Sequence, residues 1–99
     1  GAAVVLAPAD GVVAFVGTVV DRSLVTLDHG NGLVSTLEPV DASVAHSQRV
    51  TRGEAVGLLS GGGHASAGPL HVGVRLDGEY VNPLLFLGGV ERSRLLPLE

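Results

Sequence analysis

Two histidines, His64 and His71, stand seven positions apart in the glycine-rich stretch "GGGHASAGPLHVGVR", residues 61–75. An imidazole can bind a metal ion or move a proton, so this pair raises both kinds of chemistry. A hydrolytic zinc centre needs about three protein ligands and one position left open for water. Two histidines do not complete such a centre, and the chain would have to supply a third donor.

That third donor would be a carboxylate, because the chain has no cysteine. The candidates are Asp10, Asp28 and Glu38, and the sequence alone brings none of them next to a histidine. The remaining two histidines have simpler interpretations. We expect His29 to be a turn residue beside "NG", and His46 to be solvated in the polar stretch "DASVAHSQ".

The composition narrows the class of protein further. The 99 residues carry a formal net charge of −4, and the six basic residues, all arginines, form no cluster, so we expect no nucleic-acid partner. The absence of lysine excludes chemistry that needs an ε-amine. No apolar run approaches the ~20 residues of a membrane-spanning helix. We expect one domain over residues 1–99, with no membrane span.

Turn signals separate short apolar segments along the whole chain. The dipeptides Asn31-Gly32 and Asp77-Gly78 favour tight hairpin turns, because both positions tolerate a positive φ. No segment of ten or more residues keeps a helical period of 3.6. The expected strands are residues 12–20, with a bulge at Gly17, and residues 24–28, 33–39, 55–59, 70–76 and 79–81. The sequence therefore predicts an all-β domain, an antiparallel sandwich or partly open barrel.

Four motifs follow one another in a recognisable order. They are "VLAPADGVVAFVG" (5–17), "VTLDHGNGLVSTL" (25–37), "VTRGEAVGLLSGGG" (50–63) and "GPLHVGVRLDGEYVNPLLFL" (68–87). The pattern of "PADGVVAFVG" followed by "VAHSQRVTRGEAVGLLSG" is similar to that of lipoyl- and biotinyl-carrier domains. The whole series resembles the lysostaphin-like, or LytM-type, zinc metallopeptidases that cut peptidoglycan cross-links. A carrier domain attaches its cofactor to a lysine, which this chain lacks. We therefore favour the LytM-type family, in a variant that is similar to actinobacterial sequences, with a fold related to the lipoyl-biotinyl hybrid fold.

The resemblance implies a metal-ligand position at His71, which precedes "VGVR" as the family's third ligand precedes "FEVR". We keep open that His71 is simply a hydrogen-bonded strand residue. The first histidine of the family's "HxH" motif is missing, since Pro69 or a one-residue deletion stands in its place. The family's other catalytic histidine falls where this chain has Glu38 or Pro39. His64 is then expected to be an exposed loop residue.

The family's other two ligands, a histidine and an aspartate, would lie upstream of Gly1. We therefore predict no catalytic or cofactor-binding residue, with zinc possible in the family and absent from this chain. A site built from this chain alone would need His64, His71 and one of the three carboxylates.

Three functions remain, in order of preference. The first is a degenerate LytM-type domain that binds a peptidoglycan peptide or a cell-envelope protein without zinc. The second is the core of an active zinc metalloendopeptidase whose His and Asp ligands lie upstream. The third, a β module unrelated to cell walls, does not explain the ordered motifs. The resemblance implies an extracytoplasmic or cell-envelope location.

Overall fold

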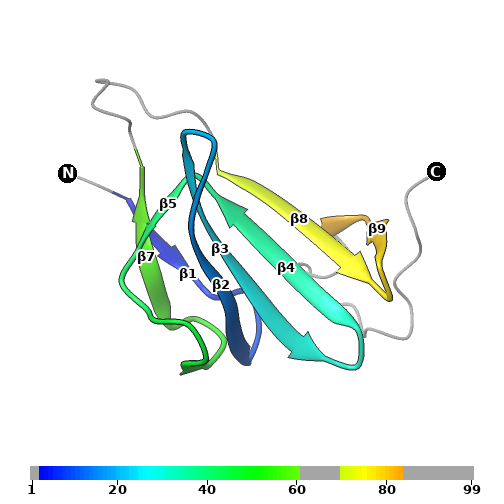
Figure 1. The fold of residues 1–99 in the computed structure, drawn as a ribbon. Coiled ribbons are helices and arrows are strands. Elements are labelled where there is room, and N and C mark those ends of the chain that lie inside the picture. The colour runs from blue at the N-terminus through cyan, green and yellow to red at the C-terminus, as the bar shows by residue number, and fades with distance from the viewer. Residues whose placement is uncertain (1–2, 61–69, 84–99) are drawn as a thin grey trace.

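The computed structural model describes residues 3–60 and 70–83, which form nine strands (Figure 1). None of the helices among these residues is long and apolar enough to cross a membrane. The predictions for His64 and Pro69 lie outside the described residues. The strands are β1 (Val4–Leu6), β2 (Gly11–Val19), β3 (Arg22–Gly30), β4 (Leu33–Glu38), β5 (Val40–Ala42), β6 (Arg49–Val50), β7 (Ala55–Leu59), β8 (His71–Leu76) and β9 (Glu79–Val81).

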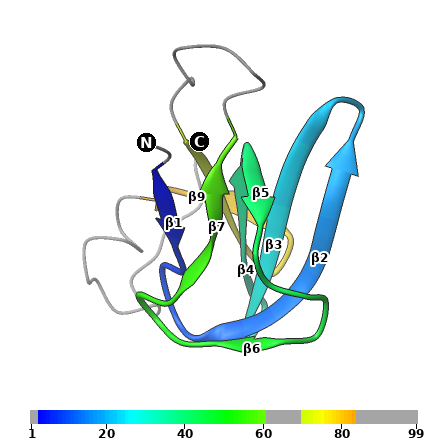
Figure 2. The ribbon, with the colours of Figure 1, turned by 90° about the vertical axis from the view of Figure 1, so that its left-hand side faces the viewer.

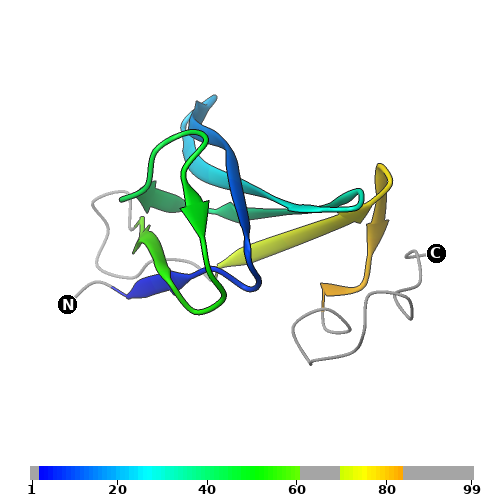
Figure 3. The same ribbon diagram turned by 90° about the horizontal axis from the view of Figure 1, so that it is seen from below.

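Two antiparallel sheets face each other. One has the order β6-β2-β3-β4-β8-β9 and the other the order β1-β7-β5. Figure 2 shows the layers from the side, with β1 and β7 on one side and β2 and β3 on the other. Seen from below, the long strands of the larger sheet extend past the smaller one toward β9 (Figure 3). The predicted all-β antiparallel fold is confirmed as two sheets that do not close into a barrel.

Both predicted hairpin turns are present. Asn31 and Gly32 have φ values of 54° and 82°, and Asp77 and Gly78 have φ values of 52° and 86°. These paired positive values suit the right-handed twist of the flanking strands. The two turns also touch, because the Asp77 backbone N–H donates to the Gly32 carbonyl at 2.9 Å. The turns thereby set the register of β4 against β8, in which Glu38 faces His71.

The bulge in β2 lies at Ala14, and the expectation of a bulge at Gly17 is wrong. The register of β2 on β3 shifts between Val13 and Phe15. Val13 and Val16 both pack into the core, although they are three positions apart in the strand. An extra residue between them is needed, because side chains alternate strictly between faces in a regular strand. Gly17 lies instead beneath the ring of Phe15, whose Cζ would be 3.1 Å from an added Cβ.

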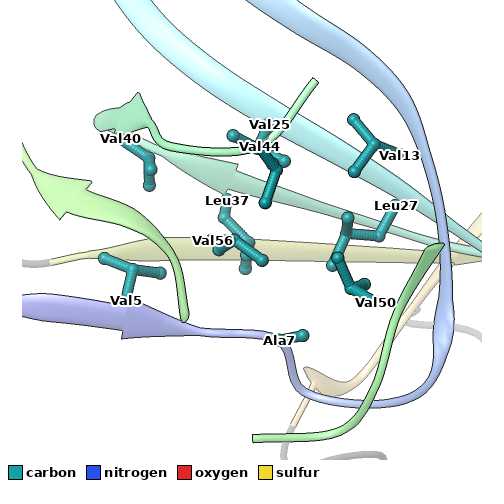
Figure 4. Close-up of a cluster of buried hydrophobic side chains, with 10 residues drawn as sticks. All are labelled: Val5, Ala7, Val13, Val25, Leu27, Leu37, Val40, Val44, Val50 and Val56. Atoms are coloured by element: carbon teal, nitrogen blue, oxygen red, sulfur yellow. The ribbon is translucent and has the colours of Figure 1, made fainter. Parts of the chain in front are cut away.

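The main core lies between the two sheets (Figure 4). Leu27 and Leu37 from the larger sheet and Val56 from the smaller one are each at most 1% exposed. Burying one such side chain stabilises the fold by about 1.5–3 kcal/mol. A second cluster of Leu33, Val74 and Val81 lies under the β8–β9 hairpin. The remaining buried residues of the main cluster are Val5, Ala7, Val13, Val25, Val40, Val44 and Val50.

The turn between β2 and β3 contains a strained residue. Val20 has a φ of 61° and is 92% exposed, so its side chain makes no compensating contacts. A β-branched residue in this region costs about 1–2 kcal/mol, which exceeds the ~0.5–1 kcal/mol entropic cost of glycine. We expect Val20→Gly to raise the melting temperature by several degrees. Val19→Gly, in the adjacent strand position, should lower the melting temperature. If thermal unfolding shows a lower melting temperature for both variants, backbone strain at Val20 is contradicted.

Candidate functional site

Strand β8 presents His71, Gly73 and Arg75 on one face of the six-stranded sheet, while Val74 is fully buried on the other. Strand β4 lies beside it and places Glu38 opposite His71 and Thr36 opposite Gly73. We call this face, which points away from the β1-β7-β5 sheet, the open face. It carries Thr36, Glu38, His71, Gly73 and Arg75. His71 is exposed there, as a strand residue.

A groove of about 270 Å³ lies on the open face. Glu38 and His71 line one end of it, Arg75 and Tyr80 line the other, and Gly73 lies between. The Arg75 Nη2 donates a hydrogen bond to the Tyr80 hydroxyl at 2.8 Å, and the guanidinium carbon is 4.8 Å from the centre of the tyrosine ring. Glu38 accepts from Arg22 across 3.3 Å. Polar side chains therefore line both ends of the groove, and the guanidinium of Arg75, bonded to Tyr80, lies at one of them.

His29 lies in strand β3, and the expectation of a turn residue is wrong. Its Nδ1 is 2.7 Å from the Asp10 carbonyl oxygen, so this nitrogen must donate its proton. In the neutral ring, Nε2 is then the acceptor, and it receives the Ser35 hydroxyl at 2.8 Å. Ser35 is fully buried, so His29 satisfies a hydroxyl that would otherwise lack a partner. The sequence signal was Ser35 itself, a polar residue at an apolar position of "LVSTL".

A larger cavity of about 650 Å³ lies at the opposite corner of the sheet, where β2 and β3 meet β6. Asp10, Asp28, His29 and Arg49 are among its lining residues. Both carboxylates already accept backbone hydrogen bonds: Asp10 accepts the N–H of Arg52, from a distant turn, at 2.7 Å, and Asp28 accepts that of Gly30 at 2.9 Å. These contacts give the acidic groups at this corner a structural role.

The last of the described histidines, His46, is exposed, as its polar surroundings predicted. Its Nδ1 lies 3.0 Å from the Ser47 hydroxyl. The two residues are adjacent in the chain, so the contact is local and joins no distant element.

Comparison with known proteins identifies the chain. The family model "Peptidase family M23" matches residues 1–83. The chain belongs to peptidase family M23. The M23 domain is also similar to the crystal structure of a Pseudomonas aeruginosa protein assigned to the M23 peptidases, with a TM-score of 0.76 and 30% sequence identity. That match covers 91% of this chain and 41% of the Pseudomonas chain, so the M23 domain spans about two fifths of that protein. No curated protein matches.

The resemblance to the LytM-type family is thus confirmed. M23 proteins are typically zinc-dependent, so we tested whether residues of this domain fit a zinc ion. Among residues 3–60 and 70–83, no three His, Cys, Asp or Glu side chains come together. Of the three proposed carboxylate donors, Glu38 lies opposite His71, while Asp10 and Asp28 lie at the far corner described above. The described residues therefore do not form a zinc site around His71.

Proposed function

We propose that this M23 domain binds a peptidoglycan peptide on its open face and does not hydrolyse it by itself. The observation that carries the proposal is the surroundings of His71. The family resemblance implies a zinc-ligand position at His71, yet its acidic neighbour Glu38 is already paired with Arg22. Two donors fall short of the three that a catalytic zinc site takes from the protein.

The groove on the open face also supports binding of a peptide. The groove is partly open to solvent, and it carries hydrogen-bonding groups from Thr36, His71, Arg75 and Tyr80. A peptide offers carboxylates, amides and backbone groups that match such a surface. The proposal places the domain in the cell envelope, where it would meet peptidoglycan.

The test combines zinc content, hydrolysis and binding of the purified protein. After incubation with zinc and removal of the excess, we expect much less than one zinc per chain by elemental analysis, and His71→Ala should not lower it. The protein should sediment with insoluble peptidoglycan and release no cleaved cross-links, as read by chromatography of the soluble fragments.

One zinc per chain together with cleavage would instead establish the active endopeptidase, with ligands from outside the described residues. Failure to sediment with peptidoglycan, while a cell-envelope protein is captured, would point to that protein as the partner. Heat-unfolded protein serves as the control for nonspecific sedimentation.

A further inference from the structure

We propose that the open-face groove recognises the C-terminal carboxylate of a short extended peptide, with Arg75 as its anchor. This inference rests on the proposed function and specifies the part of the ligand that the domain reads.

Arg75 is exposed, and no carboxylate pairs with it among the residues that the structure describes. Its side chain is nevertheless held in place by the hydrogen bond to the Tyr80 hydroxyl and by the tyrosine ring. A guanidinium has five N–H donors, so donors remain for a ligand after Tyr80 has accepted one. An ordered arginine loses less entropy on binding, and its planar fork matches a carboxylate.

Gly73 has no side chain, so the groove stays unobstructed between Arg75 and His71. A Cβ added there would meet only ordinary contact, with Tyr80 Cε1 at 3.8 Å, and its φ is not in the left-handed region. Neither packing nor backbone conformation therefore requires glycine, although glycine weakens a strand. The missing side chain leaves room for a backbone to approach the sheet closely.

The dimensions fit the end of a peptide. His71 and Arg75 lie four residues apart on one strand, which is about 13 Å at ~3.3 Å per residue. An extended ligand of about four residues spans this distance, with its carboxylate at Arg75 and a backbone or side-chain group at His71. The groove volume of about 270 Å³ is slightly below the ~300–1,000 Å³ of typical small-molecule pockets. It therefore holds the end of a chain and leaves the rest in solvent.

Electrostatics agree with an anionic ligand despite the net charge of −4. The acidic residue that lines the groove is Glu38, at the far end from Arg75, and Arg22 contacts its carboxylate. Among the residues that line the groove, the charge at the Arg75 end is therefore that of the guanidinium, which attracts a carboxylate.

The test is a nuclear magnetic resonance titration with tetra-alanine as the free acid and as the C-terminal amide. We expect the acid to shift backbone amide signals of β8 and β9, and the amide to bind about tenfold more weakly or worse, because a charge-assisted hydrogen bond is lost. Arg75→Gln should weaken binding of the acid by a similar factor. Arg52→Gln, an equal change of charge at an exposed turn, should leave the affinity unchanged.

Gly73→Val supplies a second variant that tests the groove floor. It should block binding of the acid while the melting temperature stays equal or rises, since valine favours strands. Equal affinity for acid and amide, or equal weakening by Arg75→Gln and Arg52→Gln, would overturn the proposal.

The two proposals fail in different ways. If the protein sediments with peptidoglycan but acid and amide bind alike, carboxylate recognition is wrong and peptidoglycan binding stands. If the acid binds through Arg75 but nothing sediments, peptidoglycan is the wrong ligand and the carboxylate site stands. If neither probe binds, both proposals are wrong.

Discussion

Replacing Gly57 with alanine is expected to lower the free energy of unfolding by about 3 kcal/mol. Gly57 is buried in β7, the central strand of the smaller sheet, where it pairs with Val5 of β1 and Ala42 of β5. An added Cβ would lie 2.7 Å from Val40 Cγ1 and 3.0 Å from the Ala42 Cα. Because hydrogen bonds to both neighbouring strands fix the backbone, the methyl group can be accommodated only by separating β7 from β5.

Urea unfolding measures this loss as a lower midpoint with an unchanged slope. The matched control is Gly73→Ala, the same chemical change in a strand of the larger sheet, where a Cβ meets nothing closer than 3.8 Å. We expect that variant to stay within about 0.5 kcal/mol of the parent or to exceed it. Equal losses for the two variants would show that crowding is not what requires glycine at position 57.

The second large effect is expected for His29→Ala, which should lower the free energy of unfolding by about 2 kcal/mol. The substitution removes the hydrogen bond to the Asp10 carbonyl and leaves the buried Ser35 hydroxyl without the imidazole Nε2 that accepts its proton. His29 also joins three segments of the chain, namely the loop before β2, the end of β3 and the middle of β4. We expect local amide exchange to increase at the start of β2 as well.

A double-mutant cycle with Ser35→Ala separates these contributions. In the His29→Ala background, Ser35→Ala should cost less than in the parent, because the hydroxyl there no longer has the imidazole as its acceptor. Strictly additive losses in chemical unfolding would mean that the two side chains do not act as a unit.

Local signals in the sequence were sufficient for several strands and turns of both sheets. The dipeptides Asn31-Gly32 and Asp77-Gly78 adopt the positive φ values that hairpin turns need, and the expected strands over residues 55–59 and 79–81 match β7 and β9. These features depend on backbone preferences of adjacent residues, which sequence reasoning can read directly. The family motifs likewise led to M23, which the family model supports.

Features that depend on packing between distant segments were missed. The bulge lies at Ala14 because Val13 and Val16 must both reach the core, whereas the sequence drew attention to Gly17. Strand β5 was not expected, because residues 40–42 become a strand by pairing with β7. The role of His29 depends on partners 19 and 6 positions away in the chain.

For the functional site, the sequence by itself determined which groups are available: His71 in a strand, Gly73 and Arg75 at alternate positions after it, and neither cysteine nor lysine anywhere. The neighbours of these groups depend on how the strands pair. Pairing of β8 with β4 and β9 sets His71 opposite Glu38 and joins Arg75 to Tyr80, while Asp10 and Asp28 are used in turns at another corner. The physical reason is that strand register, fixed by two hairpin turns and one buried face, selects which side chains meet across the sheet.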